Sequence, residues 1–123
     1  MTRTKLASMS VPQLVELFTA IGLNQYTARM GDDIAKYNRL FDEMTLVVGE
    51  LQRRAGDQRS ALIKLYDHPN IQVRLAAAKK TLALAPSQAR QLIEAVAGSG
   101  QPVYAGDAGM CLWALDQGIF KPA

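Results

Sequence analysis

The chain has 123 residues, of which 49% are hydrophobic and 20% are charged, values typical of a water-soluble globular domain. Fourteen Lys and Arg residues against eleven Asp and Glu give a net charge of +3, which does not indicate a densely basic nucleic-acid-binding protein. One cysteine and one histidine exclude an intrachain disulfide and a zinc site built from Cys and His side chains, so we expect neither a metal nor a cofactor.

The N-terminus has no apolar run of the kind found in signal peptides, and no segment approaches the roughly 20 apolar residues of a membrane span. We therefore expect a cytoplasmic protein without membrane association, formed by one helical domain over residues 1–123. Residues 1–9 are expected to be disordered. Residues 10–55 are expected to form an N-terminal helical hairpin, and residues 57–118 to form the remaining helices in pairs.

The hairpin is expected to start at Ser10, a residue type that accepts hydrogen bonds at helix N-termini. Gly22 either ends the first helix or only weakens it. Asp32 or Asp33 caps the second helix, which is expected to run to about Arg54. The apolar residues of this second helix recur at steps of three and four, so one whole face is expected to be buried. They are Ile34, Tyr37, Phe41, Met44, Val48 and Leu51.

Two further helices are expected on either side of a short corner in the sequence. Asp57 can cap the first of them, which ends at the His68–Pro69 pair because a residue before proline avoids the helical conformation. Asn70 can cap the next helix, which is expected to reach about Ala85.

The last two helices are expected on either side of a loop rich in Gly and Pro. One covers about residues 87–97 and the other about 108–117, with Asp107 as the cap of the second. Ile119 and Phe120 of the tail are expected to fold back onto the core. No stretch alternates with a period of two for long enough to form a strand, so the sequence predicts an all-α fold with about six helices.

The corner from Asp67 to Asn70 is interpreted as a tight turn between two antiparallel helices. The run Ala76–Ala78 that follows gives the next helix a thin face, which lets two helix axes approach closely. Asp67 and Arg74 are expected to meet across the turn in a charge-assisted hydrogen bond. Both are therefore interpreted as structural residues.

This corner resembles a HEAT-type helical repeat, in which an acidic residue and a short turn precede Val–Arg and paired alanines. Two of the helices also begin about 30 residues apart, as expected for stacked helix pairs. The resemblance implies a HEAT-like α–α array with the 10–55 hairpin outside the repeat. Thr81 stands where the repeat usually has leucine. The matching residues are Asp67, Pro69, Val73, Arg74, Ala77 and Ala78.

A second resemblance covers most of the chain after Asp32. The chain is similar to a bacterial family known as a domain of unknown function, number two thousand nineteen. This similarity implies a HEAT-like helical fold and carries over no activity. The segments that resemble the family are Asp33–Met44, Asp67–Pro86, Gly106–Met110, Leu112–Asp116 and Gly118–Ile119.

Few residues have the type and spacing of a catalytic site. His68 precedes a proline and has no partner visible in the sequence, and Cys111 occupies an apolar helical position, so both are interpreted as structural. The densest acidic set fits helix capping and a solvated helix face better than a metal site. We therefore expect a protein that is not an enzyme. The acidic set is Asp32, Asp33, Asp42 and Glu43.

The candidate interaction surface consists of Tyr37, Asn38, Lys79, Lys80 and Trp113. Asn38, at the edge of an apolar stripe, either bonds a neighbouring helix or lines a groove. Trp113 either packs beneath the C-terminal tail or, if exposed, anchors an interface.

Two functions compete. The first is a protein-interaction module, a regulator or immunity-type partner of another bacterial protein, because stacked helix pairs expose extended surfaces. The alternative is a weak binder of the nucleic-acid backbone, which requires the basic side chains to share one face. Those side chains are Arg53, Arg54, Arg59, Arg74, Lys79 and Lys80.

Overall fold

The computed structural model describes residues 2–123. Over these residues it contains six α-helices, one 3-10 helix and no strand, which confirms the predicted all-α fold. The helices form two compact units, of which the first ends at Leu62 and the second begins at Ile63. The expected single domain over residues 1–123 stays a prediction.

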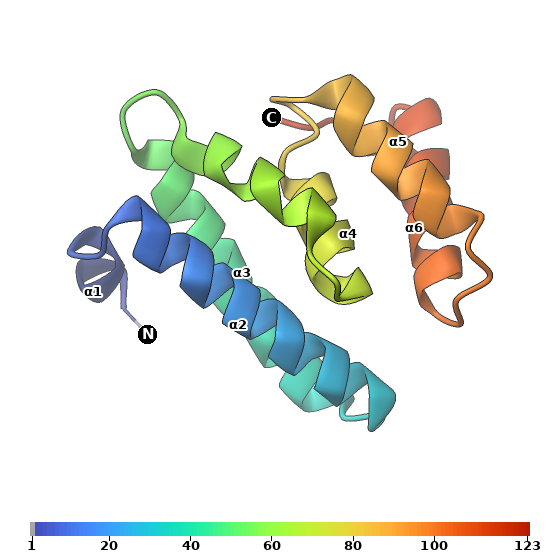
Figure 1. Cartoon of the computed structure of the whole chain (residues 1–123), viewed down its shortest axis with the longest axis horizontal. Helices are drawn as coiled ribbons and strands as arrows, with labels where there is room; N and C mark the ends of the chain where they lie inside the picture. The colour runs from blue at the N-terminus through green and yellow to red at the C-terminus, as the bar shows by residue number, and fades with distance from the viewer. Residues whose placement is uncertain (1) are drawn as a thin grey trace. The chain divides into compact units, whose positions relative to one another are not determined.

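The first unit is built on an antiparallel hairpin of α2 (Val11–Met30) and α3 (Ile34–Arg53), which lie side by side (Figure 1). Both expected caps are present. Gln13 N donates to Ser10 Oγ over 3.2 Å, and Lys36 N donates to Asp33 Oδ1 over 3.1 Å. Satisfying these N–H groups fixes the start of each helix.

Helix α2 continues without a break through Gly22, which is buried. The buried face of α3 is narrower than the sequence indicated, because Ile34 is 71% exposed and Phe41 is 47% exposed. The buried part of the apolar stripe therefore starts only at Leu40. The side chains at the centre of the hairpin are Leu14, Phe18, Ile21, Met44, Val47 and Leu51.

The N-terminal segment, for which the sequence predicts disorder over residues 1–9, contains a short helix in its described part, residues 2–9. Arg3–Ala7 forms helix α1, which packs on α3. Leu6 of α1 is only 1% exposed. The segment is also bonded to a distant side chain, Arg54, a contact that no local sequence pattern reveals.

The connection to the second unit is a 3-10 helix, η1 (Gln58–Asp67), followed by α4 (Ile71–Lys80). Asn70 caps α4 as expected, since its Oδ1 accepts hydrogen bonds from the backbone N–H groups of Gln72 and Val73. Helix α4 ends at Lys80 rather than near Ala85. The backbone leaves the helical conformation at Thr81, with φ −116° and ψ 10°, and the Thr81 hydroxyl donates to the carbonyl oxygen of Ala77 in the last turn.

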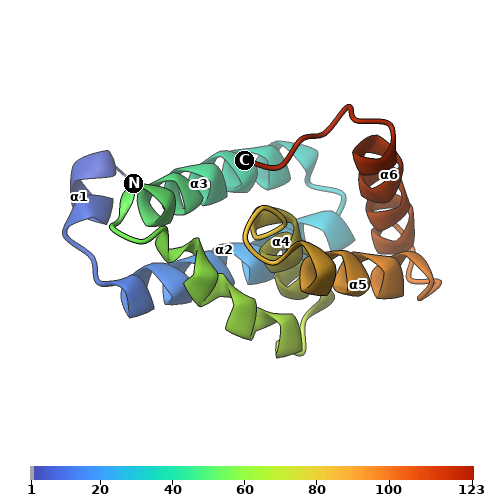
Figure 2. The same cartoon turned by 90° about the horizontal axis from the view of Figure 1, so that it is seen from above.

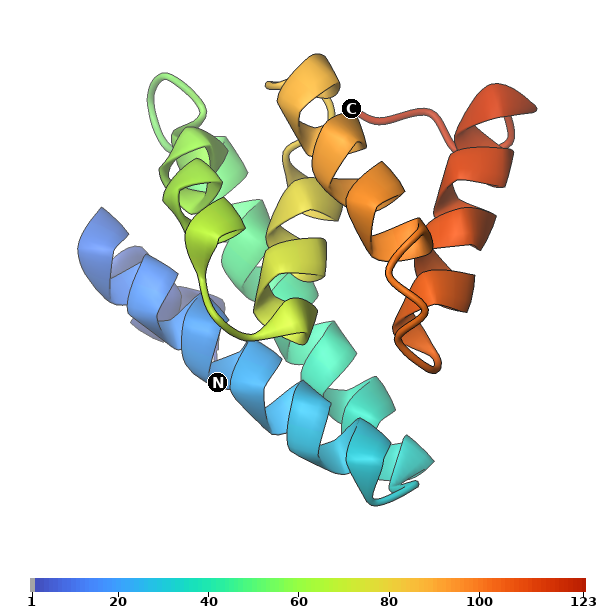
Figure 3. The same ribbon diagram turned by 45° about the vertical axis from the view of Figure 1, so that its right-hand side comes forward.

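Helices α5 (Pro86–Ala97) and α6 (Tyr104–Asp116) complete the second unit, and α5 lies between α4 and α6 (Figures 2 and 3). The alanine face of α4 is buried, with Ala77 and Ala78 both 0% exposed. Small side chains at these positions allow close helix packing, as the sequence predicted.

The C-terminal end departs from expectation in two ways. Helix α6 begins at Tyr104, so Asp107 lies in its first turn and not at the cap. Ile119 and Phe120 do not return to the core, since they are 67% and 38% exposed. Their backbone N–H groups instead bond the carbonyl oxygen of Ala114, which closes the end of the helix and leaves the two side chains outside.

The expected contact between Asp67 and Arg74 is not formed. Arg74 Nη1 donates to the carbonyl oxygens of His68 and Pro69, each at 2.9 Å. Within residues 2–123 no hydrogen bond or ion pair joins Asp67 to Arg74, and Asp67 is exposed. The turn is tied by a side chain bonded to backbone, because the carbonyl groups of the corner point towards the guanidinium.

Candidate interaction surface on α6

The outer side of α6 carries an exposed apolar strip. We define the α6 face as Val103, Gly106, Met110 and Trp113, which recur at steps of three and four and therefore share one side of the helix. Val103, Met110 and Trp113 are 56%, 64% and 52% exposed. Gly106 adds no side chain between them and has open space above it. Three large apolar groups thus face solvent together.

Val103 has a strained backbone, with φ 71° and ψ −50° at the start of α6. Tyr104 N donates to the carbonyl oxygen of Pro102 over 2.8 Å, so Val103 is the central residue of a γ-turn with positive φ. A β-branched residue rarely adopts this conformation, which costs on the order of 1–3 kcal/mol. In this conformation the Val103 side chain is exposed.

The inner side of α6 is fixed to the rest of its unit. Tyr104 and Ala108 are buried. Asp107 Oδ1 accepts a hydrogen bond from Lys79 Nζ of α4 at 2.5 Å, and Asp116 pairs with Arg90 of α5 at 3.0 Å. These two bonds tie the first and last turns of α6 to other helices of its unit.

The two ion pairs also remove charge from the surroundings of the α6 face. Each carboxylate of α6 faces a basic side chain of its own unit, and Arg90 additionally contacts Glu94 at 3.4 Å. The four residues of the face are uncharged. The strip is therefore apolar and nearly neutral, which suits an apolar partner surface better than a charged polymer.

The structure divides the five sequence-predicted surface residues between the two units. Tyr37 and Asn38 lie on α3 of the first unit. The guanidinium of Arg29 stacks over the Tyr37 ring, 4.5 Å from its centroid. Asn38 is exposed, so it does not act as a buried link between helices.

The other three surface residues belong to the second unit and have different surroundings. Lys79 is held by Asp107, as described above. The Lys80 side chain is largely buried, and burial, with a smaller contribution from the Lys79 charge, lowers the pKa of its ammonium group. Trp113 is exposed, which settles the choice between packing beneath the tail and facing solvent. Only Trp113 therefore belongs to the α6 face.

Sequence reasoning missed Val103 and Met110. The steps from residue 103 to 106, 110 and 113 follow a helical face, but Asp107 was assigned as the helix cap and thereby left Val103 outside the helix. The signal that could have found the face is this spacing, once the helix is allowed to start directly after Pro102.

The arginines of the proposed nucleic-acid-binding set have partners within their own unit. Arg53 and Arg54 both bond the Glu50 carboxylate, at 3.1 and 2.7 Å. Arg59 bonds the Asp57 carboxylate through two nitrogens, and its side chain is only 8% exposed. Phosphate binding by these three arginines would have to compete with their carboxylate partners.

The residues with chemical reactivity have structural surroundings. His68 Nδ1 accepts a hydrogen bond from Asn70 N at 3.0 Å inside the turn. Cys111 is half-buried, and burial raises the pKa of its thiol. In the part of the chain that the structure describes, no three His, Cys, Asp or Glu side chains are placed to hold a metal ion.

Residues 12–116 match the family described as "Domain of unknown function (DUF2019)", and the chain belongs to this family. Among solved structures, it is similar to the protein RPA1889 from Rhodopseudomonas palustris CGA009, with 49% sequence identity and a TM-score of 0.92. That similarity covers 96% of this chain and 98% of the other. No curated protein matches the chain. None of the helices within residues 2–123 combines the length and apolar character needed to cross a membrane.

Proposed function

We propose that the protein is a non-enzymatic, cytoplasmic protein-interaction module, and that the α6 face binds an apolar surface of a partner protein. The observation that supports this most directly is the pair Met110 and Trp113, which are 64% and 52% exposed on the same helix. Tryptophan and methionine are enriched at the centres of protein interfaces, and a large aromatic side chain often contributes most of the binding free energy.

The proposal includes a regulator or immunity-type role and a HEAT-like origin of the second unit. The acidic corner, the Val73–Arg74 pair and the buried alanines of α4 support that relationship. Repeats of this type bind partners along exposed helices.

A protein partner is favoured over nucleic acid because the exposed strip is uncharged and the neighbouring basic groups are paired. The alternative predicts measurable, salt-dependent affinity for DNA or RNA. Fluorescence anisotropy with a labelled duplex of mixed sequence, at low and at physiological salt, tests it. Micromolar affinity at physiological salt that is lost in a Lys79→Ala variant would favour the alternative.

The partner can be identified by photo-crosslinking in the organism that produces the protein. A photoreactive benzoyl-phenylalanine is placed at Trp113, and in a control protein at Leu84, which is also apolar and 37% exposed but lies outside α6. We expect an adduct with one particular protein from the first position and not from the second. The same crosslinked proteins captured from both positions would contradict the proposal.

Capture alone is not sufficient, so the captured protein is then purified and its affinity measured. Trp113→Ala should weaken binding by about tenfold or more, as for a central aromatic anchor, while Leu84→Ala should leave it within about twofold. An adduct of the chain with itself, together with a concentration-dependent sedimentation coefficient, would instead identify α6 as a contact between two copies. Unchanged affinity of the Trp113 variant would exclude the α6 face.

A further inference from the structure

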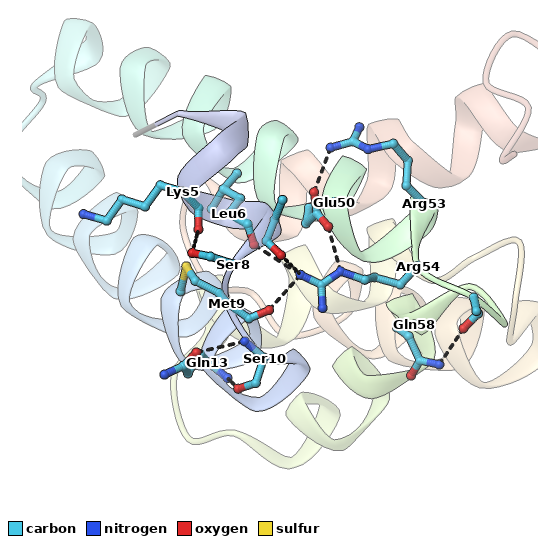
Figure 4. A network of polar contacts seen from close by, with 12 residues as sticks. Lys5, Leu6, Ser8, Met9, Ser10, Gln13, Glu50, Arg53, Arg54 and Gln58 are labelled. Atoms are coloured by element: carbon cyan, nitrogen blue, oxygen red, sulfur yellow. Dashed lines mark hydrogen bonds and ion pairs between the residues drawn. The ribbon is translucent and has the colours of Figure 1, made fainter.

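One arginine joins the N-terminal segment to the end of α3 (Figure 4). Arg54 Nη2 donates to the carbonyl oxygens of Leu6 at 3.2 Å and Met9 at 2.7 Å, with a longer contact to Ala7 at 3.4 Å. These carbonyl groups belong to the end of α1 and to the residues that follow it. The bonded residues are more than forty positions apart in sequence, so the bonds attach the N-terminal segment to α3.

The guanidinium of Arg54 is itself oriented by an acidic side chain. Arg54 Nε donates to Glu50 Oε2 at 2.7 Å, and Arg53 Nη2 donates to the other carboxylate oxygen at 3.1 Å. The Glu50 side chain is only 9% exposed. Arg53 and Arg54 thus share one carboxylate. Of the two, only Arg54 also bonds the described segment before Ser10, so Arg53 is a matched control.

The rest of the attachment is slight. Helix α1 has five residues, far fewer than the twelve or so that an isolated helix needs to persist in water. Leu6 is its single buried residue. The carbonyl groups at its end require partners. Ser8 and Met9 bond those of Lys5 and Leu6 from within the segment, and Arg54 supplies the only bonds to them from another helix among the described residues. Helix formation in this segment is therefore coupled to its attachment on α3, and both depend on Arg54 and Leu6.

We propose that residues 2–9 form a latch, which opens and closes as one unit while α2 and α3 remain folded, with Arg54 as its lock. In the closed state α1 covers part of α3. In the open state the segment loses its helix, because the cap at Thr2 and the bonds of its own short turns do not maintain a five-residue helix in water. The covered part of α3 then meets solvent. The device is an order–disorder transition confined to one end of the first unit.

Hydrogen exchange of the complete chain, followed by NMR or by mass spectrometry of peptides, tests this proposal. In the wild-type protein the amides of Leu6, Ser8 and Met9, which are hydrogen-bonded, should exchange at least about tenfold faster than that of Val47 in the hairpin core, because local opening requires less free energy than global unfolding. Equal protection of Leu6 and Val47 would overturn the proposal without the need for any variant.

Two variants then test the lock. Arg54→Ala should accelerate exchange at Leu6 and Met9 by about tenfold, since it removes charge-assisted hydrogen bonds to backbone, and should leave Val47 within about threefold. Arg53→Ala should change the latch amides by less than about threefold. Unchanged exchange of the latch in Arg54→Ala would show that Arg54 is not the lock. Equal acceleration at Val47 would show that opening is not local.

Discussion

Arg74 is bonded to the carbonyl oxygen of Pro69, five residues before it, by a hydrogen bond of 2.9 Å from Nη1. The same nitrogen donates to the carbonyl oxygen of His68. The guanidinium thus satisfies two backbone acceptors that the turn between η1 and α4 would otherwise leave to solvent. The Arg74 side chain thus stabilises the turn through bonds to main-chain carbonyl groups, and the adjacent carboxylate of Asp67 forms no bond to Arg74.

Alanine variants of these two residues should therefore differ. Arg74→Ala should lower the free energy of unfolding by about 1–2 kcal/mol, because it removes hydrogen bonds from a charged donor in a partly exposed site. Asp67→Ala should change it by less than about 0.5 kcal/mol. Chemical denaturation of the two single variants and the double variant measures this. The double variant should equal the sum of the singles, and a coupling above about 0.5 kcal/mol would contradict the bonding described here.

The turn also shows what a sequence can and cannot reveal. The helix boundary at Pro69 and the cap at Asn70 follow from conformational preferences of single residues, and both were predicted correctly. The partner of Arg74 could not be predicted in the same way. Every residue carries a carbonyl group, so the sequence does not indicate which of them bonds Arg74. That choice depends on the direction of the carbonyl groups, which only the three-dimensional structure of the turn shows.

Thr81, which departs from the repeat pattern, has a specific polar role. Its hydroxyl donates to the Ala77 carbonyl oxygen and contacts the hydroxyl of Tyr66. Because a threonine hydroxyl has one proton, Tyr66 must be the donor in the second bond. Burial raises the pKa of Tyr66, and the bond to Thr81 opposes that shift.

Replacing Thr81 by valine should lower the free energy of unfolding by about 1–3 kcal/mol, since it leaves the Tyr66 hydroxyl partly buried without its acceptor. Tyr66→Phe removes that hydroxyl and should partly relieve the cost. The double variant should therefore be more stable than the sum of the two single effects predicts. Additive effects in denaturant titrations would mean that the two hydroxyl groups do not interact.

The buried alanine face of α4 predicts a large response to added volume. Ala77→Leu should lower the free energy of unfolding by about 1–3 kcal/mol or more, because Ala77 is 0% exposed and the added atoms force its neighbours apart. Ala95→Leu on the exposed side of α5 is the control, with an expected change below about 0.5 kcal/mol. Similar melting temperatures for the two variants would show that Ala77 does not lie in a close contact.

The acid sensitivity of the first unit should depend on Glu50. The hydrogen bond from Arg54 is the largest influence on the pKa of Glu50 and lowers it. Burial opposes this effect, and the hydrogen bond from Arg53 adds to it, so the pKa lies below its ordinary value of 4.5. A carboxyl group with a lower pKa in the folded state contributes stability above the unfolded pKa, and loses it as the pH falls through the folded pKa.

The measurement is the melting temperature of wild type and Glu50→Gln as a function of pH. The wild type should melt at the higher temperature near about pH 7. The difference should shrink as the pH falls below about 4.5, where the unfolded carboxyl group takes up a proton, and on through the lower pKa of the folded state. Glu50→Gln keeps the shape of the side chain and removes the titration. A difference that stays constant down to about pH 3 would rule out this origin of the acid sensitivity.

Val103 should be one of the few positions where glycine stabilises the protein. Its positive φ is unfavourable for valine, and glycine adopts that conformation without strain, so Val103→Gly should raise the free energy of unfolding by about 1 kcal/mol after the entropy cost of glycine. Val103→Ala retains a Cβ atom and should have a much smaller effect. Thermal melting of both variants measures this, and a lower melting temperature for the glycine variant would contradict the strain.

The helices themselves were largely predictable, whereas the candidate surface was not. Caps at Ser10, Asp33 and Asn70 and the breaker at Pro69 are local signals, and they placed most helix ends within a few residues. Which side of α6 faces solvent depends on packing against α5 and on a backbone conformation that Val103 disfavours. The conformational preference of valine disfavours a positive φ at Val103. The sequence therefore indicated a helix that starts later, and the spacing of the α6 face was not recognised.

Trp113 is the only tryptophan of the chain, and it is 52% exposed on α6. The intrinsic indole fluorescence of the protein therefore originates from the α6 face alone. Its emission maximum should lie at the long wavelengths of a hydrated indole, and iodide should quench it readily. Unfolding should change the spectrum only slightly, so this signal is a poor reporter of stability. Burial of the indole against another surface should shift the emission to shorter wavelengths. Binding of a partner to the α6 face can therefore be followed by tryptophan fluorescence without a label.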